Sequence, residues 1–266
     1  MVSSEQRRKQ LARQKYERQL KRREAARRKA RIRNVSIALG LVMVLAMGGA
    51  YAASGGLNGD EKDDAAADQP SAPPTSKAPD PCEKPAKGRP TGKQWKKEPP
   101  MKVDKSASYT MRLETTCGGI DIDMDAGEAP HTVNSFHFLA GQKFFDHTRC
   151  HRMTDQPQLH VLQCGDPTGT GSGGPGYELS DENLKGAEYP AGTVAMANSG
   201  PDTAGSQFFL VYEDSKLPPK YTPFGKVSDS GMKVLKKIAK AGVASPQGDG
   251  PPNATVVIDK ATVRKS

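Results

Sequence analysis

An arginine, a glutamine and a phenylalanine lie in segments that are predicted to be strands. Their side chains suit a site that acts on a ligand without forming or breaking a covalent bond. Arg152 ends the stretch FDHTRCHR, Gln163 lies in the probable returning strand VLQCGDP, and Phe209 ends a polar run in ANSGPDTAGSQFFL (197–210). An arginine is always charged and presents its N–H groups in a fixed fork, so it can donate to a lone pair or a developing negative charge. Gln163, paired across the hairpin, could orient that guanidinium or hold a carbonyl group.

The two adjacent phenylalanines, Phe208 and Phe209, follow a series of turn residues directly. Side chains alternate along a strand, so one ring should face the core and the other can contact a ligand. Arg152 alone would also fit a structural ion pair. The arginine gains a functional interpretation only together with Gln163 and a phenylalanine.

Motifs for covalent, metal or nucleotide chemistry are absent from the sequence or fail on their context. There is no G-x-S-x-G elbow and no H-E-x-x-H, and no two cysteines have C-x-x-C spacing. Residues 169–174, GTGSGG, fit G-x-G-x-x-G, but Pro175 and Gly176 follow where a nucleotide-binding helix would begin. The five histidines are interpreted as surface or packing residues. We therefore expect neither a metal nor a cofactor.

The elements that would position these residues form a mainly β domain over residues 107–266. Alternating apolar residues predict a β-hairpin over 109–124. Pro130 suits the first turn of a helix, a second helix is predicted over 231–241, and a closing strand over 255–258. Many short strands with two separate helices favour a β-barrel capped by helices.

Four cysteines, an even number, all follow the apolar segment described below. Disulfides are therefore the favoured interpretation, with four buried thiols as the alternative. Cys150 and Cys164 flank the probable hairpin and would close a short loop. That pair leaves Cys82 to bond with Cys117, which would fasten the end of the linker to the first strands.

The N-terminal part has three compositional segments. Residues 1–34 form a basic tail, in which 14 of the chain's 39 lysines and arginines occur before residue 34. Residues 35–53 carry no charge and are long enough to cross the ~30 Å bilayer core as a transmembrane helix. The basic tail predicts a cytoplasmic N-terminus and an extracytoplasmic C-terminal domain. A cleaved signal peptide is the rival interpretation, because Ala50-Tyr51-Ala52 resembles a cleavage site.

Composition also suggests what these segments contact. Residues 54–106 are rich in Pro, Ala, Gly and charged residues, which predicts a disordered linker. The basic tail suits anionic lipid at the membrane surface. RNA or DNA binding by the tail is the less favoured alternative, because such charge runs commonly flank membrane helices.

Several motifs, in order and at compatible spacing, carry a family resemblance. They are C-H-R at 150–152, Q-C-G-D at 163–166, G-T-G-x-G-G-P-G-Y at 169–177, M-A-N-S-G-P-D-T-A-G-S-Q-F-F at 196–209 and F-G-K-V at 224–227. The domain resembles the cyclophilin family of peptidyl-prolyl isomerases, and the tail and apolar segment resemble those of membrane-anchored actinobacterial members. The resemblance implies a closed antiparallel eight-stranded β-barrel with two helices, and an enzyme without cofactor or metal. We expect a monomer.

The resemblance also implies roles for individual residues. Arg152 would lie near the prolyl nitrogen, Gln163 would assist it, and Phe209 would form the floor of the proline pocket, with Phe208 in the core. Ala197 and Asn198 would offer backbone groups to an extended, proline-containing polypeptide. The predicted clients are exported or cell-envelope proteins.

The chain also departs from the pattern of the familiar members. Their pocket Phe and Met fall near His160 and Val161 here, which predicts a less apolar and pH-sensitive pocket. Lys216 or a gap stands where many members have a Trp just before Leu217, which predicts weak binding of cyclosporin-class drugs. Tyr221 falls where a histidine is often found. These departures keep open a non-catalytic module that binds or chaperones proline-containing segments.

Overall fold

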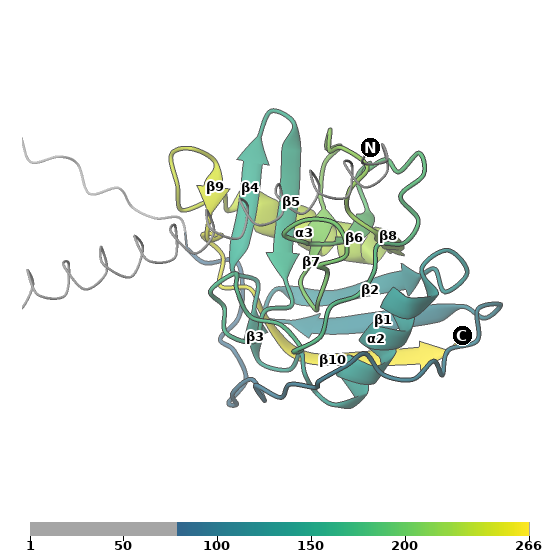
Figure 1. Ribbon diagram of the computed structural model, residues 1–266. Coiled ribbons are helices and arrows are strands. Elements are labelled where there is room, and N and C mark those ends of the chain that lie inside the picture. The colour runs from purple at the N-terminus through teal and green to yellow at the C-terminus, as the bar shows by residue number, and fades with distance from the viewer. Residues whose placement is uncertain (1–78, 266) are drawn as a thin grey trace, which may run out of the picture. The chain divides into compact units, whose positions relative to one another are not determined.

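The computed structural model describes residues 79–265, which belong to one compact unit (Figure 1). The predicted basic tail, the apolar segment 35–53 and residues 54–78 of the predicted linker lie outside the described residues. Within residues 79–265, no helix is long and apolar enough to cross a membrane.

The described strands form a single sheet in the order β3-β10-β1-β2-β8-β6-β7-β5-β4-β9. They are β1 (Tyr109–Thr115), β2 (Gly118–Met124), β3 (Thr148–Arg149), β4 (Arg152–Gln156), β5 (Leu159–Cys164), β6 (Thr193–Met196), β7 (Phe208–Val211), β8 (Pro223–Val227), β9 (Asp249–Gly250) and β10 (Val257–Lys265). A mainly β domain with two helices is confirmed. The predicted eight strands are ten, because β3 and β9 add two-residue strands at the ends of the order. The sheet is a half-barrel and not the closed barrel that was predicted, since β3 and β9 pair with β10 and β4 and not with each other.

The two described helices lie against the sheet, and at the start of each a side-chain oxygen accepts backbone N–H groups. In α2 (Pro130–Gly141), proline occupies the first turn, and the Glu182 carboxylate accepts the N–H groups of His131 and Thr132. In α3 (Asp229–Lys240), the Ser228 hydroxyl accepts the Gly231 N–H, so the helix begins two residues earlier than predicted. Helix α2 packs against β10 and α3 packs against β2.

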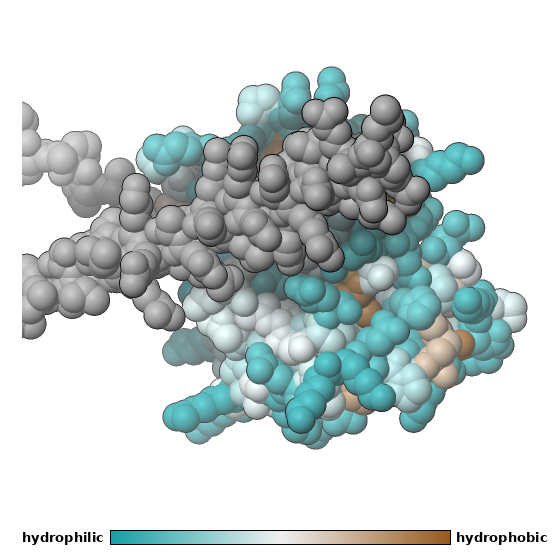
Figure 2. Space-filling view, viewed as in Figure 1, coloured by the Kyte–Doolittle hydropathy of each residue, from teal (hydrophilic) through white to brown (hydrophobic). Residues whose placement is uncertain are grey.

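Apolar side chains form two separate groups. The larger, here the interior cluster, includes Phe136, Phe145, Phe208 and Phe224, with the Phe136 ring 4.6 to 5.4 Å from the other three centroids. The smaller, here the outer cluster, has the buried members Val161, Tyr189, Ala195, Phe209 and Val211. The visible face of the described part is mostly hydrophilic, with small apolar areas among the polar side chains (Figure 2).

Residues 79–106, here the strap, run along the domain instead of continuing the predicted disordered linker. Trp95 packs edge-on against Phe138 at 5.1 Å, Val103 is buried, and the Asn134 side chain donates to the carbonyls of Pro99 and Pro100. The linker boundary predicted at residue 106 is therefore wrong for this segment. A few apolar and disulfide-bonded anchors hold it although its composition is polar.

Both predicted disulfides are present. Cys82 is bonded to Cys117, which fixes the start of the strap to the turn between β1 and β2. Cys150 is bonded to Cys164, which closes the β4–β5 hairpin at its base. The second bond lies beside the residues that the sequence marks for function.

Candidate active site

Strand register places Arg152, Gln163 and Phe209 in one row across three neighbouring strands. Arg152 of β4 is directly opposite Gln163 of β5, and Gln163 is directly opposite Phe209 of β7. Directly opposed residues in an antiparallel pair share one face of the sheet. The structure thus brings together the three residues that the sequence marks as candidate catalytic residues.

This row forms part of the lining of a cavity of about 520 Å³. Of the predicted substrate-binding residues, five line the same cavity: Val161, Ala197, Asn198, Leu217 and Tyr221. The N–H of Ala197 donates to the Gln207 carbonyl at 2.9 Å, so only the carbonyl of Ala197 is left to meet a peptide. The Asn198 side chain donates to the Lys220 carbonyl at 2.7 Å, which anchors the loop that carries Leu217 and Tyr221.

The floor of the cavity is apolar and aromatic. Phe209 is 5% exposed, and the Tyr221 ring meets it edge-on at 5.6 Å. The Tyr189 hydroxyl donates to the Tyr221 carbonyl at 2.8 Å and accepts the Tyr221 N–H at 3.1 Å. Tyr221 is therefore fixed by its backbone, and its ring forms a wall beside Phe209.

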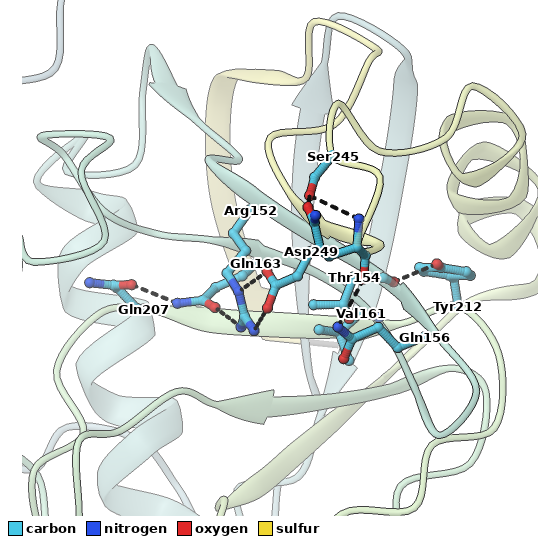
Figure 3. Close-up of polar contacts among 10 residues, drawn as sticks. Arg152, Thr154, Gln156, Val161, Gln163, Gln207, Tyr212, Ser245 and Asp249 are labelled. Atoms are coloured by element: carbon cyan, nitrogen blue, oxygen red, sulfur yellow. Dashed lines mark hydrogen bonds and ion pairs between the residues drawn. The ribbon is translucent and has the colours of Figure 1, made fainter.

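A chain of polar contacts holds the opposite side of the cavity (Figure 3). The Arg152 Nη1 donates to Gln163 Oε1 at 3.1 Å, and Gln163 Nε2 donates to Gln207 Oε1 at 2.8 Å. Gln207 Nε2 donates in turn to the carbonyls of Gly171 and Gly173. The guanidinium also donates to both carboxylate oxygens of Asp249. This hydrogen bonding to Asp249 raises the pKa of Arg152, and Arg152 lowers the pKa of Asp249.

His160 does not line the cavity, contrary to the prediction. Alternation along β5 directs Leu159, Val161 and Gln163 to the cavity face and His160 to the other face. There His160 packs against the Tyr212 ring at 5.7 Å, with its Nδ1 3.4 Å from Asp155. The pH sensitivity expected from His160 in the pocket therefore has no structural basis.

The histidine that does line the cavity is His151, which sequence reasoning treated as a packing residue. Within residues 79–265, neither of its ring nitrogens has a hydrogen-bond partner. Burial lowers its pKa, so the neutral ring is favoured. The sequence signal that could have indicated this position is the C-H-R motif, in which His151 directly precedes Arg152.

The glycine-rich segment 169–174 also borders the cavity, although it was set aside as a failed nucleotide motif. Its shape depends on Asp166, whose carboxylate accepts the N–H groups of Thr168, Thr170 and Gly171. Burial opposes ionisation of Asp166, but these hydrogen bonds prevail and lower its pKa. The anionic side chain holds the loop in its conformation. We therefore interpret the glycines as turn residues of this loop and not as a phosphate-binding site.

A second cavity of about 560 Å³ continues from the first, because both are lined by Gln163, Gly171, Ala197 and Asn198. It extends along 172–178 and 199–207 and reaches Gln94 of the strap. The two cavities together form one groove. The strap is thus part of the site, which its linker-like composition did not indicate.

Comparison with known proteins identifies the class of protein that has this domain, this row of site residues and this groove. The sequence profile described as cyclophilin type peptidyl-prolyl cis-trans isomerase/CLD matches residues 110–263. The chain therefore belongs to the cyclophilin-type peptidyl-prolyl cis-trans isomerase family.

Individual relatives agree with this membership. The chain is 50% identical over 165 residues to the probable peptidyl-prolyl cis-trans isomerase B of Mycobacterium leprae, a match that covers 58% of this chain and 56% of the relative. It is 50% identical over 164 residues to the protein of the same name in Mycobacterium tuberculosis, covering 57% and 53%. The chain thus spans about half the length of these curated relatives.

Solved structures show the same fold. A cyclophilin type peptidyl-prolyl cis-trans isomerase of Cryptosporidium parvum superposes with a TM-score of 0.52 at 25% identity, covering 60% of this chain and 99% of that one. A second crystal structure of that protein was determined in the presence of the dipeptide Ala-Pro.

Proposed function

We propose that the domain catalyses cis–trans isomerisation of X-Pro peptide bonds. The observation that carries the proposal is the row of Arg152, Gln163 and Phe209, which sets a charged donor beside an apolar aromatic floor in one groove. Membership of the family and the printed names of the mycobacterial relatives support it.

The reaction needs rotation about a C–N bond and no bond cleavage. The barrier is ~18–20 kcal/mol because that bond has partial double-bond character. As the bond twists, the lone pair returns to the prolyl nitrogen, and a donor placed there stabilises the twisted state more than the planar one. Phe209 and Tyr221 would hold the proline ring, and Arg152 would supply the donor.

The donor count of Arg152 fits this role. A guanidinium has five N–H groups, and three are committed here: Nε–H and one Nη2–H to Asp249, and one Nη1–H to Gln163. One Nη1–H and one Nη2–H are left for a ligand. Because Arg152 lines the cavity, these are the donors it can offer to a prolyl nitrogen or a flanking carbonyl.

The test is isomerisation of an X-Pro peptide by the full chain and by Arg152→Ala. We expect the substitution to lower kcat/KM by about 100-fold, the range found for removing one such preorganised donor. The matched control is Arg112→Ala, since Arg112 also pairs with a carboxylate, Asp121, at 2.7 Å but lies outside the groove. A wild-type chain that binds the peptide saturably without accelerating its isomerisation would favour the non-catalytic binding module.

We further propose that the chain is tethered to a membrane with this domain outside the cytoplasm, where it acts on exported or cell-envelope polypeptides. The uncharged segment 35–53 after a basic tail supports this topology, and so do two disulfides, which persist in oxidising compartments. The test is protease treatment of intact spheroplasts. Degradation of the domain with retention of a membrane-bound N-terminal fragment is expected, and N-terminal sequencing would reveal a cleaved signal peptide.

The basic tail is proposed to contact anionic lipid. Binding of a peptide covering residues 1–34 to phosphatidylglycerol vesicles, weakened by added salt, is the expected result. Stronger binding to RNA, unaffected by the vesicles, would contradict it.

A further inference from the structure

The guanidinium of Arg152 is gripped by a carboxylate that lies 97 residues further along the chain. Arg152 Nε donates to Asp249 Oδ1 at 2.7 Å, and Nη2 donates to Asp249 Oδ2 at 2.8 Å. Two parallel bonds from an arginine to a carboxylate fix the plane of the guanidinium as well as its position. Neither side chain is deeply buried, so the pair is a feature of the cavity wall and not of the core.

We propose that Asp249 is a positioning residue for isomerisation, which holds the Arg152 guanidinium in the one orientation that directs its two free N–H groups at the ligand. The inference rests on the proposed function of the site. It adds a fourth residue, Asp249, to the site formed by Arg152, Gln163 and Phe209.

The backbone places Asp249 for this contact. Strand β9 pairs with β4 so that Asp249 is opposite Thr154, which is two residues from Arg152 and on the same face of the strand. Gly248 has φ +68°, and a Cβ there would lie 2.2 Å from the Asp155 carbonyl oxygen, so only glycine allows this approach. The Asp155 N–H donates to the Gly248 carbonyl at 2.7 Å. A short side chain on a fixed backbone thus meets the guanidinium.

A chain of hydrogen bonds holds the opposite side of the guanidinium, and in this chain each amide group can take only one orientation of its donor and acceptor atoms. The carbonyls of Gly171 and Gly173 can only accept, so Gln207 must turn its amide nitrogen to them and its oxygen to Gln163. Gln163 must then present its own oxygen to Arg152 Nη1. Asp249 and this chain therefore constrain the guanidinium from two sides (Figure 3).

A merely structural role for the pair predicts a different result. If Asp249 served only to fasten the loop before β9 to β4, its removal would lower stability and leave turnover of the folded enzyme unchanged. The loop also has fastenings of its own, since Gly248 pairs with Asp155 and the Gln156 side chain donates to the Gln247 carbonyl. A positioning role predicts a loss in kcat that stability does not account for.

The experiment compares the full wild-type chain with Asp249→Ala and Asp249→Asn on an X-Pro peptide, with kcat and KM measured separately. We expect Asp249→Ala to lower kcat about tenfold with KM within twofold, because the ring still binds on Phe209 while the donor is free to rotate. Asp249→Asn keeps one acceptor oxygen and should lose about threefold. The matched control is Asp155→Ala on β4, whose carboxylate lies 3.4 Å from His160 Nδ1 and lines neither cavity.

A spectroscopic measurement separates positioning from folding. The side-chain Nε–H resonance of Arg152, assigned by its absence in Arg152→Lys, should exchange slowly in the wild type and in Asp155→Ala and rapidly in Asp249→Ala. An Asp249→Ala variant with unchanged kcat, or one whose loss tracks its unfolded fraction, would overturn the inference. A wild-type chain without isomerase activity would instead overturn the proposed function, and the positioning role with it.

Discussion

The interior and outer clusters lie on opposite faces of the same strands, and a single pair of residues shows the contrast. Phe208 is fully buried between Phe136 and Phe145, with centroids at 5.4 and 6.0 Å. Phe209 is also buried, but its ring neighbours are Tyr189 and Tyr221, and it borders the 520 Å³ cavity. The consecutive residues Phe208 and Phe209 therefore have different roles, because side chains alternate along a strand and one ring points to the core while the other points to the site.

The difference extends beyond this pair. The interior cluster packs against the sheet, both helices and the strap and has many fully buried members, whereas the outer cluster has five buried members and opens onto the groove. A closed cluster resists any change of volume, since surrounding atoms must collapse or leave a cavity. An open cluster can exchange its contacts for ligand or water, so its residues should matter more for binding than for folding.

The largest expected effect is on stability, from Phe208→Ala. Removing a fully buried ring from a close-packed core costs about 3–5 kcal/mol. Phe209→Ala should cost clearly less, because its vacated space adjoins the cavity, but should raise KM for an X-Pro peptide. Urea unfolding with both disulfides intact, paired with peptide kinetics, measures the two effects. Equal stability losses would show that the outer cluster is as much a folding core as the interior one.

A second prediction concerns pH and the interior cluster. Burial raises the pKa of Tyr177 to about 12, while its hydroxyl shares a hydrogen bond with Ser135 at 2.7 Å. The unfolded chain releases this proton near the ordinary value of about 10 and the folded chain keeps it, so stability falls as pH rises from about 10 to 12. The loss attributable to Tyr177 is about 2–3 kcal/mol.

Tyr177→Phe isolates this contribution, since it removes the titrating group and keeps the ring. Its stability at neutral pH should change little beyond the loss of one hydrogen bond, about 1 kcal/mol. Its decline between pH 10 and 12 should be shallower than that of the wild type in chemical unfolding curves. An identical decline in both proteins would mean that the alkaline loss arises elsewhere.

The sequence alone predicted the parts of this molecule that depend on local pattern. The hairpin 109–124 follows from alternation, and the disulfides follow from the position of Cys150 and Cys164 about a hairpin. Arg152, Gln163 and Phe209 could be placed in one site because each stands in a recognisable motif. The closed eight-stranded barrel was wrong in closure and in count, because two-residue strands such as β9 leave no periodic signal.

What sequence missed depends on contacts between distant segments. Asp249 stands in an unremarkable loop, and only the pairing of β9 with β4 brings it to Arg152. The strap looks disordered by composition, yet Trp95 and the Cys82 disulfide hold it to the domain. His160 was placed on the wrong face because it was assigned to the pocket together with its neighbour Val161, although consecutive residues of a strand point to opposite faces.

The smallest predicted effect tests that register directly. Leu159 lines the cavity and packs on the outer cluster, whereas its neighbour His160 packs against Tyr212 on the other face. Leu159→Ala should therefore raise KM for an X-Pro peptide about fivefold, equivalent to about 1 kcal/mol of lost apolar contact. His160→Ala should leave KM within about twofold and lower stability slightly through its lost ring contact. The reverse pattern, with KM raised by His160→Ala and not by Leu159→Ala, would place His160 in the pocket and would contradict the strand alternation that directs Leu159 there.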